Sequence, residues 1–102
     1  MPAPLEIDRS IRYAIRERRL IRLAYSGRTR IAEPHDYGLI DHEARLLAWQ
    51  RREEGSTRPP GWRLFGVATI TRVDVLEESF TGSRDAGQPH RFAWDPLIIR
   101  VR

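Results

Sequence analysis

The sequence predicts a mainly β domain (α+β), in which one N-terminal helix packs on a small barrel of five strands and a C-terminal tail supplies a further strand. Three observations lead to this prediction. Apolar residues repeat at helical spacing near the start, later apolar residues alternate with polar ones, and the later apolar segments are short and separated by turn formers. One helix and five short strands favour a small closed barrel over a simple sheet covered by helices.

The length of 102 residues and the hydrophobic content of 40% fit one compact domain. We assign residues 1–80 to the helix and barrel, and residues 81–102 to a linker and a tail that packs on the barrel or on a partner. The chain has no cysteine, which excludes a disulfide framework and a thiol nucleophile. The N-terminus lacks the pattern of a signal peptide and no run is long enough to cross a bilayer. We therefore expect a cytoplasmic protein with no membrane partner.

The first element is expected to be a helix from about Asp8 to Arg19, with Asp8 or Ser10 capping its first free amides. One side of this helix is apolar: Ile7, Ile11, Ala14 and Ile15. The opposite side carries four arginines: Arg9, Arg12, Arg16 and Arg19. Such a stripe is most often a solvated face, and a phosphate-contacting face is the alternative.

Strand patterning follows at once. The run LIRLAYS, a Ser26-Gly27 turn and the run RTRIAEP predict a hairpin, which Pro34 closes or kinks. Residues 34–43 form a loop or a bent strand, and ARLLAWQRR is the third strand. Residues 53–61 should form an exposed connection because they lack an apolar anchor.

Two more strands are expected around residues 62–67 and 73–77, with a short bend at residues 69–72. After a polar linker, the apolar tail is predicted to pair as an edge strand on its own barrel or on another copy. Its apolar residues are Ile98, Ile99 and Val101.

The charge balance is basic, with 18 Lys and Arg against 14 Asp and Glu. Clustered basic groups attract phosphates, so this balance favours a polyanionic partner. All of the basic residues are Arg, however, and Asn is also missing, which GC-rich coding alone would produce. The distribution of the arginines is therefore more informative than their number.

No catalytic or metal-binding pattern is present. The histidines His35, His42 and His90 do not have ligand spacing on a helical face, so ordinary loop histidines are the default reading. The acidic pairs Glu53-Glu54 and Glu77-Glu78 are expected to be solvated charges. With no GxSxG motif and no phosphate-cradling glycine loop, we expect a protein that is not an enzyme, with no cofactor and no metal. An enzyme built on His35, Asp36 and His42 is a distant alternative.

A ligand site is suggested by aromatic residues interleaved with arginines on neighbouring strands, because such surfaces stack bases and bind phosphates. Phe65, Phe80 and Trp62 are more readily explained as core. Arg45 and Arg63 stand on largely apolar strand faces, where a cation needs water or an anionic partner. The candidate ligand-binding residues are Tyr25, Arg30, Arg45, Trp49, Arg63 and Arg72.

The chain resembles the WYL domain family of bacterial regulators over residues 7–80. The resemblance is carried by AYSGRTRIAEP, ARLLAWQ, WRLFGVATITRVDVL and the following Phe80. It implies a helix followed by an SH3-like (Sm-like) five-stranded barrel. The family's name-giving Trp-Tyr-Leu corresponds here to Arg45-Leu46-Leu47, and Thr69 replaces a basic residue that is common in the family.

The resemblance implies a non-catalytic ligand-sensing or accessory module in transcription regulation, whose ligand is a nucleotide or single-stranded nucleic acid. The family's usual helix-turn-helix is absent, so we expect any action on transcription to require a partner. The alternative is a structural interaction module, which pairs its barrel edge and tail with a second copy, as a homodimer, or with a partner protein.

Overall fold

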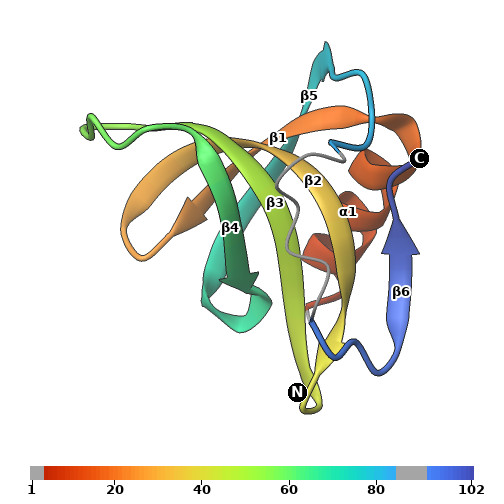
Figure 1. Ribbon diagram of the computed structural model, residues 1–102. Coiled ribbons are helices and arrows are strands. Elements are labelled where there is room, and N and C mark those ends of the chain that lie inside the picture. Colours follow the sequence, from red (N-terminus) through yellow and green to blue (C-terminus); the bar gives the residue numbers. More distant parts are fainter. Residues whose placement is uncertain (1–3, 85–91) are drawn as a thin grey trace.

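The computed structural model describes residues 4–84 and 92–102 and shows one helix packed on an antiparallel sheet of six strands (Figure 1). The elements are, in order, α1 (Leu5–Glu17), β1 (Arg19–Tyr25), β2 (Arg28–Ile40), β3 (Glu43–Glu53), β4 (Gly61–Gly66), the 3-10 helix η1 (Val67–Thr69), β5 (Ile70–Ser79) and β6 (Leu97–Arg100). Within the described residues, no helix has the length and apolar character needed to cross a membrane. The predicted mainly β class with an N-terminal helix is confirmed.

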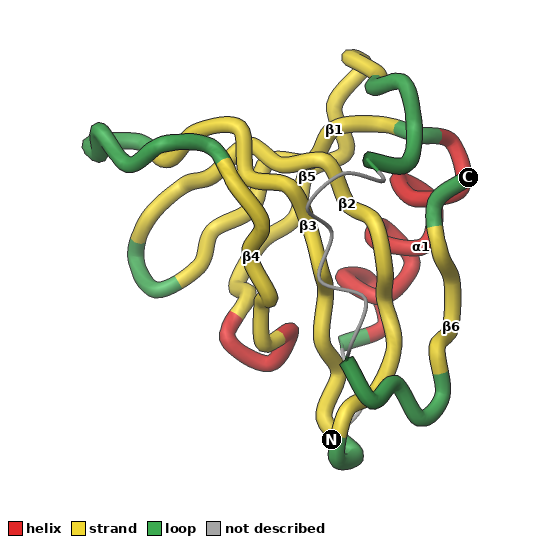
Figure 2. The backbone as a smooth tube through the Cα atoms, viewed as in Figure 1, coloured by secondary structure: helices red, strands yellow, loops and turns green. Residues whose placement is uncertain are grey.

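The sheet is open. Its strands follow the order β4-β3-β2-β1-β5, and β6 pairs with β2 outside this path. The predicted closure of the strands into a barrel is therefore not seen in the strand pairing. Figure 2 shows β2 and β3 as long, curved strands, and the connection between β3 and β4 reaches away from the rest of the fold.

Helix α1 packs its apolar stripe into the core, where Ile11, Ala14 and Ile15 are buried. The predicted helix boundaries and caps were wrong. The helix begins at Leu5 with no side-chain cap, and Asp8 lies in its first turn. It ends at Glu17 because Arg18 adopts a left-handed conformation, φ 53°, that turns the chain into β1.

The predicted hairpin of β1 and β2 is confirmed. Ser26 and Gly27 both have positive φ, 51° and 76°, which is the geometry that suits a two-residue turn between twisted strands. Beyond the hairpin, β2 does not stop at Pro34. It continues to Ile40, with one extra residue, His35, displaced from the pairing with β3.

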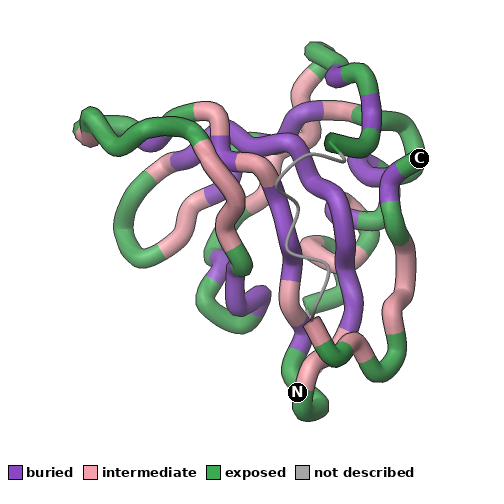
Figure 3. Tube along the Cα trace, viewed as in Figure 1, coloured by how far each residue is buried: buried purple, intermediate pink, exposed green. Residues whose placement is uncertain are grey.

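Strand β2 therefore bends at residues 34–36 and has two neighbours along one edge. Its first part pairs with β1 from Arg28 to Ala32, and its second part pairs with β6 from Asp36 to Gly38. The tail thus pairs with its own chain. Figure 3 shows that the buried positions run along β2 and into the middle of β3, so this bent strand lies at the centre of the molecule.

Candidate ligand site

Two aromatic rings from different strands form the centre of the candidate site. The ring of Tyr25, at the end of β1, meets the ring of Phe65 on β4 edge to face, with 4.9 Å between the centroids. The guanidinium carbon of Arg30 lies 5.1 Å from the Tyr25 centroid and 5.7 Å from the Phe65 centroid. Tyr25 and Phe65 are 40 positions apart in the sequence, and their strands do not pair with each other, so the curvature of the sheet brings the two rings together. A cation beside two aromatic rings is attracted by their electron density.

Arg30 is buried, and its charge is compensated inside the protein. Its Nη1 lies 3.1 Å from Glu53 Oε1 and donates to Gln50 Oε1 at 3.3 Å. Two buried donors nearby, Arg30 Nε and Gln50 Nε2, have no hydrogen-bond partner among the residues that the structure describes. The expectation that Glu53 is a solvated loop charge was wrong, because the residue ends β3 and only 8% of it is exposed.

Arg63 adds a second cation at the same end of the sheet. It donates to the carbonyls of Trp62 (2.9 Å) and Pro59 (3.1 Å), and its buried Nε has no hydrogen-bond partner within residues 4–84 and 92–102. Burial lowers the pKa of Arg63, the nearby charges of Arg58 and Arg30 lower it further, and Glu53 opposes them. The local potential is therefore positive, which favours an anion.

Arg45 stands on the same face of β3 as Trp49, and its guanidinium group reaches the candidate site only at Gly66, beside the Tyr25 hydroxyl. Its Nη1 lies 2.7 Å from the position that a Cβ on Gly66 would take, and the Tyr25 hydroxyl lies 3.9 Å from the same point. The amide of Gly66 donates to that hydroxyl at 3.4 Å. Within the described part of the chain, neither Arg45 nor Arg63 has a carboxylate within ion-pair distance. We call Tyr25, Arg30, Arg45, Arg63 and Phe65 the Tyr25 cluster.

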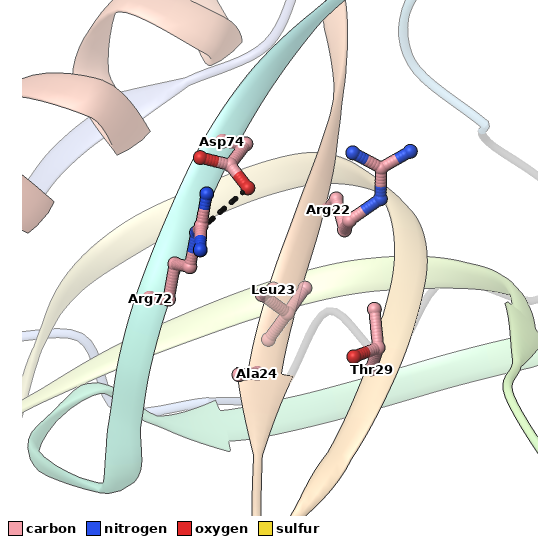
Figure 4. Close-up of a pocket in the computed structure, with 6 residues that line it drawn as sticks. All are labelled: Arg22, Leu23, Ala24, Thr29, Arg72 and Asp74. Atoms are coloured by element: carbon pink, nitrogen blue, oxygen red, sulfur yellow. Dashed lines mark hydrogen bonds and ion pairs between the residues drawn. The ribbon is translucent and has the colours of Figure 1, made fainter.

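The other two predicted ligand residues lie elsewhere. Trp49 points to the opposite face of β3 from Gln50, where it packs against Trp62 with 5.5 Å between centroids. Arg72 is exposed on β5 and is ion-paired with Asp74 at 3.0 Å. Figure 4 shows this pair on one side of a shallow hollow of about 230 Å³, with Arg22 on the other side. The structure therefore brings together four of the six predicted ligand residues.

The four arginines of the predicted helical stripe do not form one free face. Arg12 is ion-paired with Asp8 one turn earlier at 3.0 Å, and Arg16 lies near Glu17 at 3.5 Å. Arg19 belongs to β1, and its Nε donates to the Leu76 carbonyl at 2.6 Å. Only Arg9 is exposed with no ion pair among the described residues.

Sequence reasoning missed a second polar cluster at the bend of β2. Glu33, His35 and Asp36 are all at most 2% exposed. Arg84 donates to both Glu33 oxygens, at 2.7 and 2.9 Å, and Arg100 donates to both Asp36 oxygens, at 3.0 and 3.1 Å. The expectation of ordinary loop histidines was wrong for His35, which has no exposed surface.

His35 is held in one tautomer. Its Nδ1 donates to the Glu33 carbonyl at 2.9 Å, and its Nε2 accepts from the Arg84 amide at 3.3 Å. Burial lowers the pKa of His35, and the nearby Arg84 charge acts in the same direction, against the carbonyl and the charges of Glu33 and Asp36. The imidazole therefore serves the fold as a neutral bridge.

Among residues 4–84 and 92–102, no three His, Asp or Glu side chains gather closely enough to hold a metal ion. His42 lies in the exposed turn after β2, whereas His35 is fully buried. His90 lies outside the described residues. No family model, curated protein or solved structure matches the chain.

Proposed function

We propose that this chain is a non-catalytic regulatory module that binds a phosphate-bearing ligand, a nucleotide or single-stranded nucleic acid, at the Tyr25 cluster. One observation carries the proposal. Arg45 and Arg63 flank an aromatic pair without a carboxylate partner in the described part of the chain, while Glu53 compensates Arg30. Such an arrangement is suited to an anion that also offers a flat ring.

Each residue then has a distinct role. Arg45 and Arg63 are both half-buried, so they remain accessible while water screens them less than it screens a fully exposed side chain. They bind phosphate oxygens, and Tyr25, also half-buried, offers the edge of its ring and its hydroxyl. Arg30 packs on the inner side of the Tyr25 and Phe65 rings, and it keeps its ion pair with Glu53 when the ligand binds.

We further propose that the chain is a WYL-like domain with an SH3-like (Sm-like) architecture. A helix followed by five strands in the order β4-β3-β2-β1-β5, with η1 as the short connection from β4 to β5, supports this assignment. Arg45 and Leu46 stand where the family has Trp-Tyr. In this proposal Arg45 takes over the ligand contact of that missing pair.

The test is a titration with a fluorescein-labelled oligothymidylate of about ten nucleotides, at low salt, followed by fluorescence anisotropy. Arg45→Ala and Arg63→Ala are each expected to weaken binding about tenfold and to reduce the salt dependence by about one released counterion. AMP serves as the competitor that tests binding of a single nucleotide.

The matched control is Arg72→Ala, because Arg72 is an exposed arginine on another surface and is paired with Asp74. It should leave the affinity unchanged within about twofold. The proposal is wrong if the protein does not bind at low salt, or if all three alanine variants weaken binding equally.

The alternative function is a structural interaction module, which the outer edges of β4 and β5 favour. Neither edge pairs with another described strand. The tail does not serve this alternative here, because β6 already pairs with β2. A partner strand at β4 would cover Leu64, which is 37% exposed, so loss of an oligomer in Leu64→Arg, measured by light scattering, would support it.

A further inference from the structure

Arg84 occupies a preformed arginine site on its own protein. Its Nε and Nη2 donate to the two oxygens of Glu33 at 2.7 and 2.9 Å, and its guanidinium carbon lies 4.4 Å from the Trp49 ring centroid. A planar carboxylate contact combined with an aromatic face is how proteins recognise a guanidinium group. Lysine matches this geometry poorly, because its ammonium group is a single point charge.

The walls of this site do not depend on Arg84. Glu33 belongs to β2, is 2% exposed, and also accepts from Arg51 Nε at 2.9 Å. Trp49 belongs to β3 and is packed edge to face on Trp62. Two paired strands therefore fix the carboxylate and the ring in place.

The site also holds the backbone of the segment that carries the arginine. The amide of Arg84 donates to His35 Nε2, and the amide of Ser83 donates to the carbonyl of Arg102 at 3.2 Å. These contacts bind an arginine within a peptide better than free arginine, because free arginine lacks the preceding amide.

Two features make Arg84 replaceable. Its side chain is 42% exposed, and residues 80–84 contain neither helix nor strand. When Arg84 leaves, Arg51 remains on Glu33, so the buried carboxylate keeps a cationic partner. Replacement of Arg84 by an arginine of a partner therefore avoids the large free-energy cost of leaving the buried Glu33 carboxylate unpaired.

We infer that Glu33, Trp49 and His35 form a recognition site for an arginine presented by a partner polypeptide, and that Arg84 fills this site as an internal ligand until the partner replaces it. This inference is independent of the Tyr25 cluster, because Glu33, Trp49 and His35 do not belong to that cluster. The surface would thus have a closed state, bound to its own chain, and an open state, bound to a partner.

The test uses the full-length Arg84→Ala variant and two probes, ethylguanidinium and the peptide acetyl-Gly-Ser-Arg-amide, with tryptophan fluorescence as the readout of Trp49. Both probes are expected to bind the variant, and the peptide should bind more tightly. The wild-type protein should bind the peptide at least about tenfold more weakly, because Arg84 competes with it. The control peptide acetyl-Gly-Ser-Lys-amide should bind the variant about tenfold more weakly than the arginine peptide.

Adding Glu33→Gln to the variant should abolish binding of both probes. If that double variant does not fold, Trp49→Leu in the same background is used instead, and it should weaken both. The inference is overturned if the peptide binds these variants as tightly as it binds Arg84→Ala. Binding of ethylguanidinium without binding of the peptide also overturns the inference. The site would then accept only the side chain of Arg84, and the role of Arg84 would be to stabilise the fold.

Discussion

Single residues of β2 decide how this arginine-rich chain holds its buried charge. Glu33 accepts hydrogen bonds from Arg51 and Arg84, and Asp36 accepts two from Arg100. Burial raises the pKa of Glu33, but the hydrogen bonds and charges of Arg84 and Arg51 outweigh it and hold the pKa below its ordinary value. Bidentate arginine contacts of this kind satisfy a carboxylate that water does not reach.

His35 makes stability depend on pH at a single residue. Its pKa in the folded protein lies below the ordinary value of 6.5, so the folded state binds fewer protons than the unfolded state. The stabilisation by neutral His35 is therefore complete above pH 6.5, and it is lost as the pH falls from 6.5 to the pKa of His35 in the folded protein. We expect the free energy of unfolding, measured with urea, to fall by up to about 1.4 kcal/mol per pH unit in that window.

His35→Gln should remove most of this slope, because glutamine does not titrate while its amide can still donate and accept. His42→Gln is the matched control and should retain the slope, since His42 lies in an exposed turn. The pKa of Glu33 lies below its ordinary value of 4.5, so Glu33 does not account for the loss of stability that begins just below pH 6.5. An unchanged slope in His35→Gln would contradict the assignment.

At the scale of elements, β2 links the two parts of the sheet, and Gly38 allows β6 to approach it. A Cβ at this glycine would lie 2.9 Å from Trp94 Cε3 and 3.0 Å from Leu97 Cα. Gly38→Ala should therefore push the segment before β6 away and destabilise the fold by about 1–3 kcal/mol. Hydrogen exchange is expected to accelerate at the Leu39 and Val101 amides, which bond to Pro96 and His35 carbonyls.

Gly61→Ala provides the control for this prediction. A Cβ there would meet Arg63 Nη1 at 3.0 Å, which is the movable end of a long side chain. It should cost little stability and leave exchange at β6 unchanged. Unaltered exchange at Leu39 in Gly38→Ala would show that the tail accommodates the extra methyl group.

Most of the elements could be predicted because their signals are local. The alternation of apolar residues and the Ser26-Gly27 turn lie within a few positions of the hairpin that they form. Pro34 left two alternatives open, a strand that ends there and a strand that is kinked there, and the structure shows the kinked strand, because the extra residue His35 lets pairing with β3 resume. The sequence alone does not show this bulge.

The candidate site could be predicted only in part, for a related reason. Strand alternation correctly groups Arg63 with Phe65, but it separates both Arg45 and Trp49 from that face. Arg45 meets the cluster only because its long side chain reaches Gly66. The buried acids escaped prediction because their partners are distant in sequence. Arg84 is 51 residues from Glu33, and Arg100 is 64 residues from Asp36. A glutamate or aspartate is ordinarily a surface residue, and only the fold reveals such pairs.

At the scale of the whole molecule, the segment after residue 80 completes the core that the rest of the chain begins. Val101 is buried in the same cluster as the helix, and β6 adds bonds to β2. Removing residues 81–102 takes away β6, Val101 and the two hydrogen bonds of Arg100 to Asp36, whereas Glu33 loses Arg84 but keeps Arg51. Loss of the arginine partner of a buried carboxylate such as Asp36 costs about 3–5 kcal/mol, which is comparable to the whole stability of a small domain.

We therefore expect a chain of residues 1–80 to lose its cooperative unfolding transition, measured by circular dichroism in urea, whereas the full chain retains it. The double variant Arg84→Ala, Arg100→Ala separates the contribution of the two ion pairs to stability from that of the packing of Val101 and β6. It should be destabilised, mainly at Asp36, but still unfold cooperatively, because Val101 and the β6 backbone remain. If residues 1–80 unfold as cooperatively as the full chain, the domain ends at residue 80. The ion pairs of Arg84 and Arg100 then only attach the C-terminal segment to that domain.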